Sequence, residues 1–291
     1  MASWQIGKVR VTQVVESRGA TAPGFLFDGL TPGQVQVHRW LRPHFAHADG
    51  RLFMSIHCFV IESEGRRIVV DTCVGNDKER PVTMWHRLQG RFLDDMAEAG
   101  FPAGSIDTVL CTHLHVDHVG WNTRLVDGHW TATFPNARYL FGRLEWEHWS
   151  RTEDAGDAQV MADSVRPVLD AGLVQLVEAD HVLTGEVSLQ PTPGHTPGHV
   201  SVRIVSDGQQ AVITGDVMHH PIQCCEPDRS ARFDVDAVAA RATRRAFLGQ
   251  HADRKVLVLG THFAAPTAGW VVRCGDAWQF AVERPADEPA G

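Results

Sequence analysis

The residues best suited to chemistry are concentrated in the segment CTHLHVDHVGWN, which runs from Cys111 to Asn122. Three histidines and one aspartate fall between His113 and His118. Imidazole nitrogens and carboxylate oxygens are ligands that zinc and similar divalent ions prefer. His113 and His115 are two positions apart after an apolar run, so an extended backbone would point both side chains to the same side.

Asp117 and His118 come after a further turn, so their side chains can face a second point in space. One segment can therefore supply ligands to two neighbouring metal positions. A polar loop without a ligand role is the alternative, but the full H-x-H-x-D-H pattern directly after an apolar strand favours a metal site.

Other apolar runs of the chain end in residues of the same kind. RIVV is followed by Asp71, QAVIT by Gly-Asp216, and KVLVL by Gly-Thr-His262. The segment LQPTPGHTPGH adds His195 and His199. Strands that end in histidine or aspartate can gather these side chains at one edge of a sheet, where loops vary over a rigid frame.

Such a cluster suits two divalent metal ions, most of all zinc, although manganese, iron and cobalt accept the same ligand types. A carboxylate such as Asp216 can bridge two ions about 3.5–4 Å apart, and a bound ion lowers the pKa of water toward about 7. The residues therefore predict a hydroxide nucleophile that works at neutral pH without serine or cysteine.

The elements that must position these residues alternate along the chain. The predicted strands are His57–Ser63, Arg67–Val70, Thr108–Cys111, Ala137–Phe141, His199–Ser206, Gln210–Thr214 and Lys255–Leu259. Helical spacing of apolar residues predicts helices over Trp85–Ala99, Leu144–Trp149, Val160–Leu169 and Val235–Phe247, the last with Asp234 as its N-cap. This alternation predicts a layered α/β architecture with sheet packed between helices.

The chain of 291 residues is expected to form a single domain over residues 1–291, with a frayed tail at about 284–291. It contains no apolar run of about 18 residues, so no membrane-spanning helix is expected. The start MASWQIGKVRVTQ lacks the basic and apolar parts of a secretory signal, and a cytoplasmic location is therefore predicted.

The net charge of −8 disfavours a broad nucleic-acid surface, which needs clustered lysine and arginine. The six cysteines form no C-x-x-C pair, and most are interpreted as buried thiols in a reducing compartment. Nothing next to Cys224 and Cys225 in the sequence argues for reactivity.

Four motifs, THLHVDH, TPGHTPGH, TGDV and GTHF, resemble the successive motifs of the metallo-β-lactamase superfamily. The resemblance extends over residues 7–280 and implies a four-layer αβ/βα sandwich with a dinuclear site at one edge. It implies that one ion is held by His113, His115 and His195, the other by Asp117, His118 and His262, with Asp216 as the bridge. Asp71 matches an early aspartate of the family that is usually structural.

Within the superfamily, TPGHTPGH and GDVMHHP are most similar to the branch of lactonases and methyl-parathion-hydrolase-like enzymes. True β-lactamases generally lack the bridging aspartate. In acyl-homoserine-lactone lactonases, a tyrosine three residues after that aspartate assists the carbonyl oxygen. His219 stands at this position here, and the only tyrosine, Tyr139, is remote in sequence. His219 would donate to an oxyanion in its place or form part of the pocket wall.

The hypothesis is a dinuclear metal-dependent hydrolase that uses a metal-bridging hydroxide on lactones or other uncharged esters, with phosphotriesters as a side activity. Asp117 is the candidate proton shuttle and His219 the candidate oxyanion donor. An iron-dependent redox enzyme, a thioesterase and a non-catalytic metal-binding sensor are the alternatives. The expected partner is a small ester or lactone, and the sequence leaves a homodimer open.

The pocket wall is predicted from proximity to the motifs. Candidate aromatic residues are Trp121, Trp146, Trp149 and Trp270. Residues 22–30 and 40–45 are candidates for the segments that cover the site.

Overall fold

Two sheets form the centre of the computed structural model, which describes residues 1–283, so the predicted tail at 284–291 lies outside the described residues. The first sheet has the spatial order β1 (Ala2–Ile6), β2 (Val9–Thr21), β3 (Leu52–Ser63), β4 (Arg66–Val70), β5 (Thr108–Cys111), β8 (Arg138–Gly142) and β9 (Val174–Val177). The second has the order β10 (Val187–Pro191), β11 (Val200–Ser206), β12 (Gln209–Ile213), β13 (Val256–Leu259), β14 (Ala268–Cys274) and β15 (Ala277–Ala281). A separate hairpin pairs β6 (Thr123–Val126) with β7 (His129–Ala132).

Short helices surround the sheets. They are α1 (Pro23–Leu26), α2 (Pro32–Val37), α3 (Phe92–Glu98), α4 (Val116–Val119), α5 (Arg143–Trp149), α6 (Ala155–Val160), α7 (Arg166–Asp170), α8 (Ile222–Cys225) and α9 (Ala237–His251). A π-helical turn, Met161–Val165, joins α6 to α7, so the helix predicted over Val160–Leu169 is present with a widened middle. Single 3₁₀ turns occur at Arg39–Leu41, Thr83–Trp85, Ala103–Ser105, Gly120–Asn122 and Gly215–Val217.

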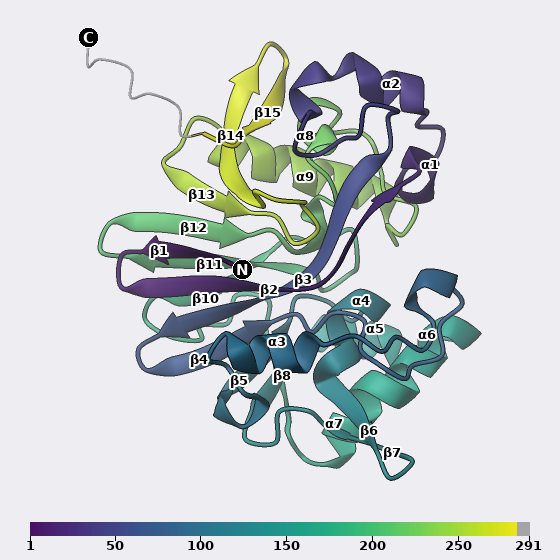
Figure 1. Ribbon diagram of the computed structural model, residues 1–291. Coiled ribbons are helices and arrows are strands. Elements are labelled where there is room, and N and C mark those ends of the chain that lie inside the picture. The colour runs from purple at the N-terminus through teal and green to yellow at the C-terminus, as the bar shows by residue number, and fades with distance from the viewer. Residues whose placement is uncertain (284–291) are drawn as a thin grey trace.

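Three apolar cores separate four layers. Val11 and Ile61 of the first sheet pack with Val202 and Ile204 of the second. The opposite face of the first sheet is covered by α3, α5 and the α6–α7 segment, and the opposite face of the second by α8 and α9 (Figure 1). The order helix, sheet, sheet, helix confirms the predicted αβ/βα sandwich.

The direction of the strands explains where the polar residues collect. β4, β5 and β8 run parallel in the first sheet, and β12 and β13 run parallel in the second. The carboxyl ends of parallel strands lie at the same edge of a sheet, so residues that follow these strands meet there. Both edges face the same cavity, described below.

The helix predicted from Trp85 to Ala99 is wrong in its first half. The helical part begins only at Phe92, and Arg87 has a left-handed backbone with φ of 48°. The preceding residues pair instead with a neighbouring loop, since Arg87 N–H donates to the Lys78 carbonyl. Gly100 ends the helix with φ of 93°, a positive value that glycine adopts readily after the last turn of a helix.

The helix predicted from Val235 exists, but its N-cap was wrongly predicted. Asp236, not Asp234, accepts hydrogen bonds from the first free N–H groups of α9. Within the helix, the apolar side chain of Val238 is 69% exposed, whereas Arg244 and Phe247 are buried. Asp234 has a different role, because its carboxylate contacts His195.

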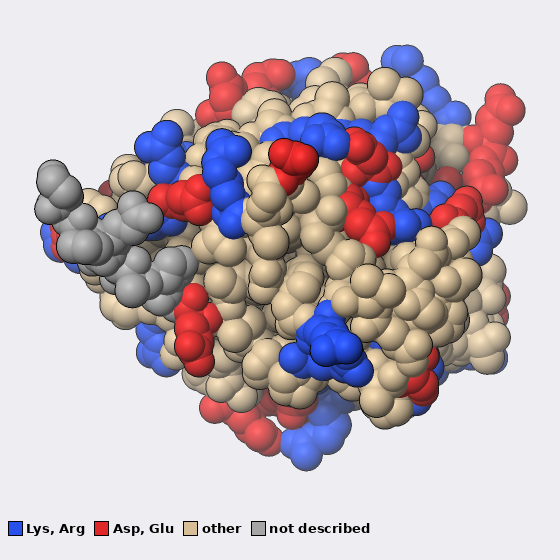
Figure 2. All heavy atoms as spheres, turned by 90° about the horizontal axis from the view of Figure 1, so that it is seen from above, with Lys and Arg blue, Asp and Glu red and all other residues tan. Residues whose placement is uncertain are grey.

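The surface carries charges of both signs. On the face seen in Figure 2, lysine and arginine side chains are interspersed with aspartate and glutamate. Among the described residues, no helix is long and apolar enough to cross a membrane.

Candidate metal centre

The strand ends bring all seven predicted ligand residues into one cluster. His113 follows β5, and Asp117 and His118 lie on α4 directly beyond it. His195 comes from the loop between β10 and β11, Asp216 from the turn after β12, and His262 from the segment after β13. Two sheets therefore contribute to one site.

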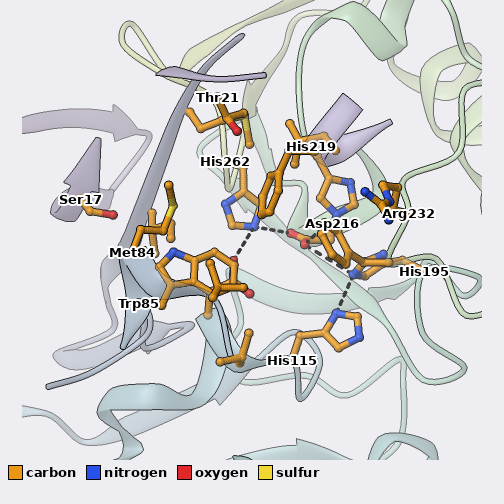
Figure 3. A pocket seen from close by; sticks show the side chains of 18 of the residues that line it. Ser17, Thr21, Met84, Trp85, His115, His195, Asp216, His219, Arg232 and His262 are labelled. Carbon is orange, nitrogen blue, oxygen red and sulfur yellow. Dashed lines mark hydrogen bonds and ion pairs between the residues drawn. The ribbon is translucent and has the colours of Figure 1, made fainter. Parts of the chain in front are cut away.

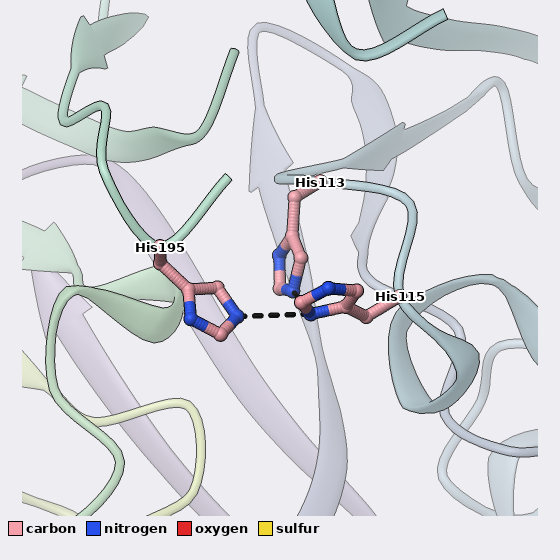
Figure 4. A group of neighbouring side chains, drawn as sticks. All are labelled: His113, His115 and His195. Carbon is pink, nitrogen blue, oxygen red and sulfur yellow. Dashed lines mark hydrogen bonds between the residues drawn. The ribbon is translucent and has the colours of Figure 1, made fainter. Parts of the chain in front are cut away.

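One group of donors is formed by three histidines (Figure 4). His113 Nε2 lies 3.1 Å from His115 Nδ1, and His195 Nε2 lies 2.9 Å from the same Nδ1 atom. Burial lowers the pKa of His113 and of His195 well below the usual range. These rings are therefore neutral at physiological pH, which is the form that binds metal.

The second group is formed by Asp117, His118 and His262, whose ligand-type atoms lie within 4.8 Å of one another. His262 Nε2 is 3.2 Å from His118 Nε2 and 3.6 Å from Asp117 Oδ2. Burial lowers the pKa of His118, but Asp216, Asp71 and Asp117 outweigh this effect and raise it well above the usual range.

Asp216 lies between the two groups (Figure 3). Its Oδ2 is 3.5 Å from His195 Nε2 and 3.3 Å from His118 Nε2, while its Oδ1 is 3.2 Å from His262 Nε2. His219 Nε2 also approaches Oδ2, at 3.1 Å. A single carboxylate thus faces nitrogen donors of both groups.

The donor set fits divalent metal ions. Within each group the ligand-type nitrogen and oxygen atoms lie within 4.8 Å of one another. Zinc and related divalent ions prefer such a mixture of imidazole and carboxylate ligands. Asp216 Oδ1 is buried and accepts no hydrogen bond from the residues that the structure describes. His262 Nε2 lies 3.2 Å away without forming a hydrogen bond to it, and a cation would satisfy a buried carboxylate oxygen that lacks hydrogen bonds.

Two further carboxylates orient histidines of the cluster from behind. Asp234 Oδ1 lies 2.9 Å from His195 Nδ1, and Asp71 Oδ2 lies 3.0 Å from His118 Nδ1. Asp71 also accepts a hydrogen bond from the Thr112 backbone N–H, at 2.7 Å. Carboxylates in this position fix the ring orientation of metal-binding histidines and increase their basicity.

Glu145 connects the two loops that carry the histidines. From α5, its Oε2 accepts from the Leu114 backbone N–H at 3.2 Å, and its Oε1 accepts from the Gly198 N–H at 2.7 Å. A Cβ atom at Gly198 would lie 2.7 Å from the Glu145 backbone nitrogen, so only glycine allows this close approach. Glu145 is fully buried and holds both loops at a fixed separation.

His199, which the sequence analysis grouped with the polar strand ends, has a structural place. Its Nε2 accepts from the Asp216 backbone N–H at 2.7 Å, and its Nδ1–H donates to the Thr192 carbonyl at 3.0 Å. Burial lowers the pKa of His199 to about 4, so the ring is neutral. It sets the position of the Asp216 backbone.

A cavity of about 680 Å³ opens above the cluster. Its floor includes His115, Asp117, His195, Asp216 and His262, and its walls are largely apolar (Figure 3). The wall includes Met54, Ile56, Val82, Met84, Trp85 and Trp149. The site is therefore suited to a small molecule with a substantial apolar part.

The predicted pocket wall is partly correct. Trp149 lines the cavity, whereas Trp121, Trp146 and Trp270 do not. Phe25 and Leu26 of the segment 22–30 line it, and no residue of 40–45 does. Trp85 was missed because it lies on a 3₁₀ turn within a stretch whose spacing mimics a longer helix.

Fold and site together define a class of protein. A model of the metallo-β-lactamase superfamily matches residues 51–262, which include all seven clustered residues. The chain belongs to the metallo-β-lactamase superfamily, and the resemblance inferred from the motifs is confirmed.

More particular similarity is to lactonases. The N-acyl homoserine lactonase of a Bacillus species is 25% identical over 174 residues, which cover 56% of this chain and 63% of that enzyme. The lactonase AiiA of Bacillus thuringiensis subsp. kurstaki is 25% identical over 181 residues, which cover 58% of this chain and 66% of AiiA. The matched region thus spans less than two thirds of either relative.

Solved structures resemble the whole chain in fold. Hydrolase AbOPH of the beta-lactamase superfamily superposes with a TM-score of 0.80 at 23% identity, over 98% of both chains. AidC, a dizinc quorum-quenching lactonase, superposes with a TM-score of 0.79 at 19% identity, again over 98% of both chains.

Proposed function

We propose that the protein is a dinuclear metal-dependent hydrolase of lactones or other uncharged esters, with phosphotriesters as a side activity. The observation that carries the proposal is Asp216, whose carboxylate faces nitrogen donors of two groups at the floor of an apolar cavity. The superfamily and the lactonase relatives support the same class of reaction.

In this proposal, His113, His115 and His195 hold one ion and Asp117, His118 and His262 the other, with Asp216 shared. Two such ions, zinc in the first place, supply a hydroxide nucleophile at neutral pH and polarise the oxygen under attack. Proton transfer to the leaving oxygen and stabilisation of the substrate oxygen are assigned to side chains of the protein.

Asp117 has an accessible carboxylate in the cavity floor, with its side chain 15% exposed. From this position it can carry a proton to the leaving oxygen. The apolar walls above it favour an uncharged acyl or aryl group and exclude water from the reacting centre.

His219 is the candidate donor to the substrate oxygen. It lines the cavity, and its ring is parallel to that of His262, with an interplanar angle of 8°. Its Nδ1 is buried without a hydrogen bond among the described residues, while Nε2 faces the cluster. An N–H at Nε2 can donate a hydrogen bond to a carbonyl oxygen and stabilise negative charge on it.

The test is a panel of lactones, aryl esters, thioesters and phosphotriesters, assayed with protein loaded with zinc, manganese, iron or cobalt in turn. Turnover of lactones or esters by the zinc-loaded form is expected. Turnover of thioesters alone would favour a thioesterase, and iron bound during expression with a characteristic absorption spectrum would favour a redox enzyme. Failure of every substrate with every metal would refute the proposal.

The variant Asp216→Asn tests whether this carboxylate is shared between two ions. The amide keeps the shape but cannot share charge between two ions, so we expect bound metal to fall below two ions per chain and kcat to fall by about 10³-fold or more. Asp157→Asn, which changes another carboxylate of the same cavity, is the control and should retain both ions. Full activity of Asp216→Asn would contradict the shared-ligand assignment.

A further inference from the structure

A second cluster of reactive side-chain types lies outside the metal centre and its cavity. His38, directly after α2, meets Cys225 and Glu226 at the end of α8. Cys225 Sγ is 3.5 Å from His38 Nδ1, and Glu226 Oε1 is 2.8 Å from His38 Nε2. The imidazole therefore connects a thiol on one side with a carboxylate on the other.

The arrangement is held in place by its surroundings. Arg229 pairs with the other oxygen of Glu226, which keeps the carboxylate turned toward His38. The Cys225 thiol donates to the Ile222 carbonyl at 3.1 Å, so its sulfur lone pairs remain free to accept from the His38 ring. His38 and Glu226 side chains are 23% and 24% exposed, and Cys225 is also partly exposed.

This geometry is that of an activated nucleophile. A thiol next to a histidine that is oriented by a third polar group is the general pattern by which proteins make cysteine reactive. The contacts with Cys225 and then Glu226 raise the pKa of His38 to about 10. The ring lies 3.5 Å from the sulfur, so it can hold the sulfur in place and pass a proton to a leaving group.

The neighbouring thiols lack these features. Cys224 is buried on the same short helix, and burial raises the pKa of its thiol. Cys274 lies on β14 and is exposed, so accessibility alone would make it the faster of the two accessible thiols.

We propose that Cys225 is a site of covalent modification by small soft electrophiles, with hydroperoxides as the class that acts on it. In the reaction with hydrogen peroxide, the sulfur attacks one peroxide oxygen, an S–O bond forms and the O–O bond breaks. The thiol proton leaves with the second oxygen as water, and the product is a sulfenic acid. His38 assists by holding the sulfur and by relaying the thiol proton to the departing oxygen.

The test uses metal-loaded protein at pH 7 and limiting iodoacetamide, which alkylates sulfur with loss of iodide. The rate at each cysteine is followed by peptide mass spectrometry. We expect Cys225 to react about ten times faster than Cys274, despite the greater exposure of Cys274. Brief treatment with hydrogen peroxide, followed by dimedone, should label Cys225 first.

Variants separate activation from accessibility. His38→Gln should slow alkylation of Cys225 about tenfold, and Glu226→Gln should slow it less. His47→Gln is the matched control, since His47 pairs with Asp49 at the surface without a thiol nearby. Thermal unfolding checks that each variant is folded. If wild-type Cys225 reacts no faster than Cys274, or if folded His38→Gln leaves its rate unchanged, the proposal is wrong.

Discussion

At the scale of single residues, two carboxylates behind the histidines orient donors of the proposed centre. Asp234 and Asp71 each contact the ring nitrogen that points away from the cluster. Each therefore selects which nitrogen faces inward. Neither carboxylate belongs to the set of seven proposed ligands.

Replacing Asp234 by asparagine is expected to weaken metal binding about 10- to 100-fold, because His195 loses the anionic partner that orients its ring. Competition with a chromophoric chelator measures this affinity. Asp236→Asn is the matched control: it alters the N-cap of α9 two residues away and should leave the affinity unchanged. Equal affinities of wild type and Asp234→Asn would show that the contact does not tune the site.

His219 is tested by replacement with phenylalanine, which keeps an aromatic ring but removes both nitrogens. If the ring donates to the substrate oxygen, kcat should fall about 10²- to 10³-fold while two ions per chain remain bound. Metal content by mass spectrometry is measured on the same preparation. A loss of metal would instead assign His219 to the ligand set.

At the scale of elements, the segment between β4 and α3 forms one wall of the cavity and is fastened at two points. Glu16, the extra residue of a bulge in β2, accepts from the backbone N–H groups of Val74 and Gly75. Farther along, Arg80 makes two hydrogen bonds to Asp163, at 2.7 and 2.8 Å. These contacts anchor the backbone that leads to Met84 and Trp85.

Asp163→Asn should lower the free energy of unfolding by about 3 kcal/mol, because it leaves the buried charge of Arg80 without its partner. Lys78 is affected too, since burial lowers its pKa to about 7 and Asp163 opposes that shift. Urea unfolding of the metal-loaded protein measures the change. Asp228→Asn, which breaks an exposed pair with Arg245, is the control and should cost about 1 kcal/mol or less.

Much of this organisation could be predicted from the sequence where the signal is local. The strand Thr108–Cys111 matches β5, and the histidines that follow it lie in the cluster. Asp234 was misassigned because an aspartate before an apolar run predicts an N-cap equally well at Asp234 and at Asp236. Only contacts across 39 residues distinguish the two.

Glu145 illustrates the same limit. In the segment LEWEHW it reads as a surface residue of a helix, yet its carboxylate bonds to backbone groups 31 and 53 residues away. A buried carboxylate with such distant partners produces no pattern in the neighbouring sequence from which its role could be predicted. The Cys225–His38 contact, across 187 residues, was invisible for the same reason.

At the scale of the whole molecule, the proposed ions join two layers. Removal of metal with a chelator should lower the melting temperature, and added zinc should restore it, because a ligand that binds only the folded state stabilises it by about 2.7 kcal/mol at a hundredfold excess over Kd. Differential scanning calorimetry measures the shift. Asp216→Asn, which we expect to bind fewer than two ions per chain, should show a smaller shift on chelation, and a shift equal to that of the wild type would contradict the proposed site.

The division of the donors along the chain has a further consequence. Four precede the connection between β9 and β10, and three follow it, so each half of the chain holds an incomplete set. In the proposed function, a polypeptide interrupted within this connection would give two fragments that each carry part of the ligand set, so the proposed ions would bind only where both fragments meet. Recovered activity would then measure the reassembly of two separately produced fragments.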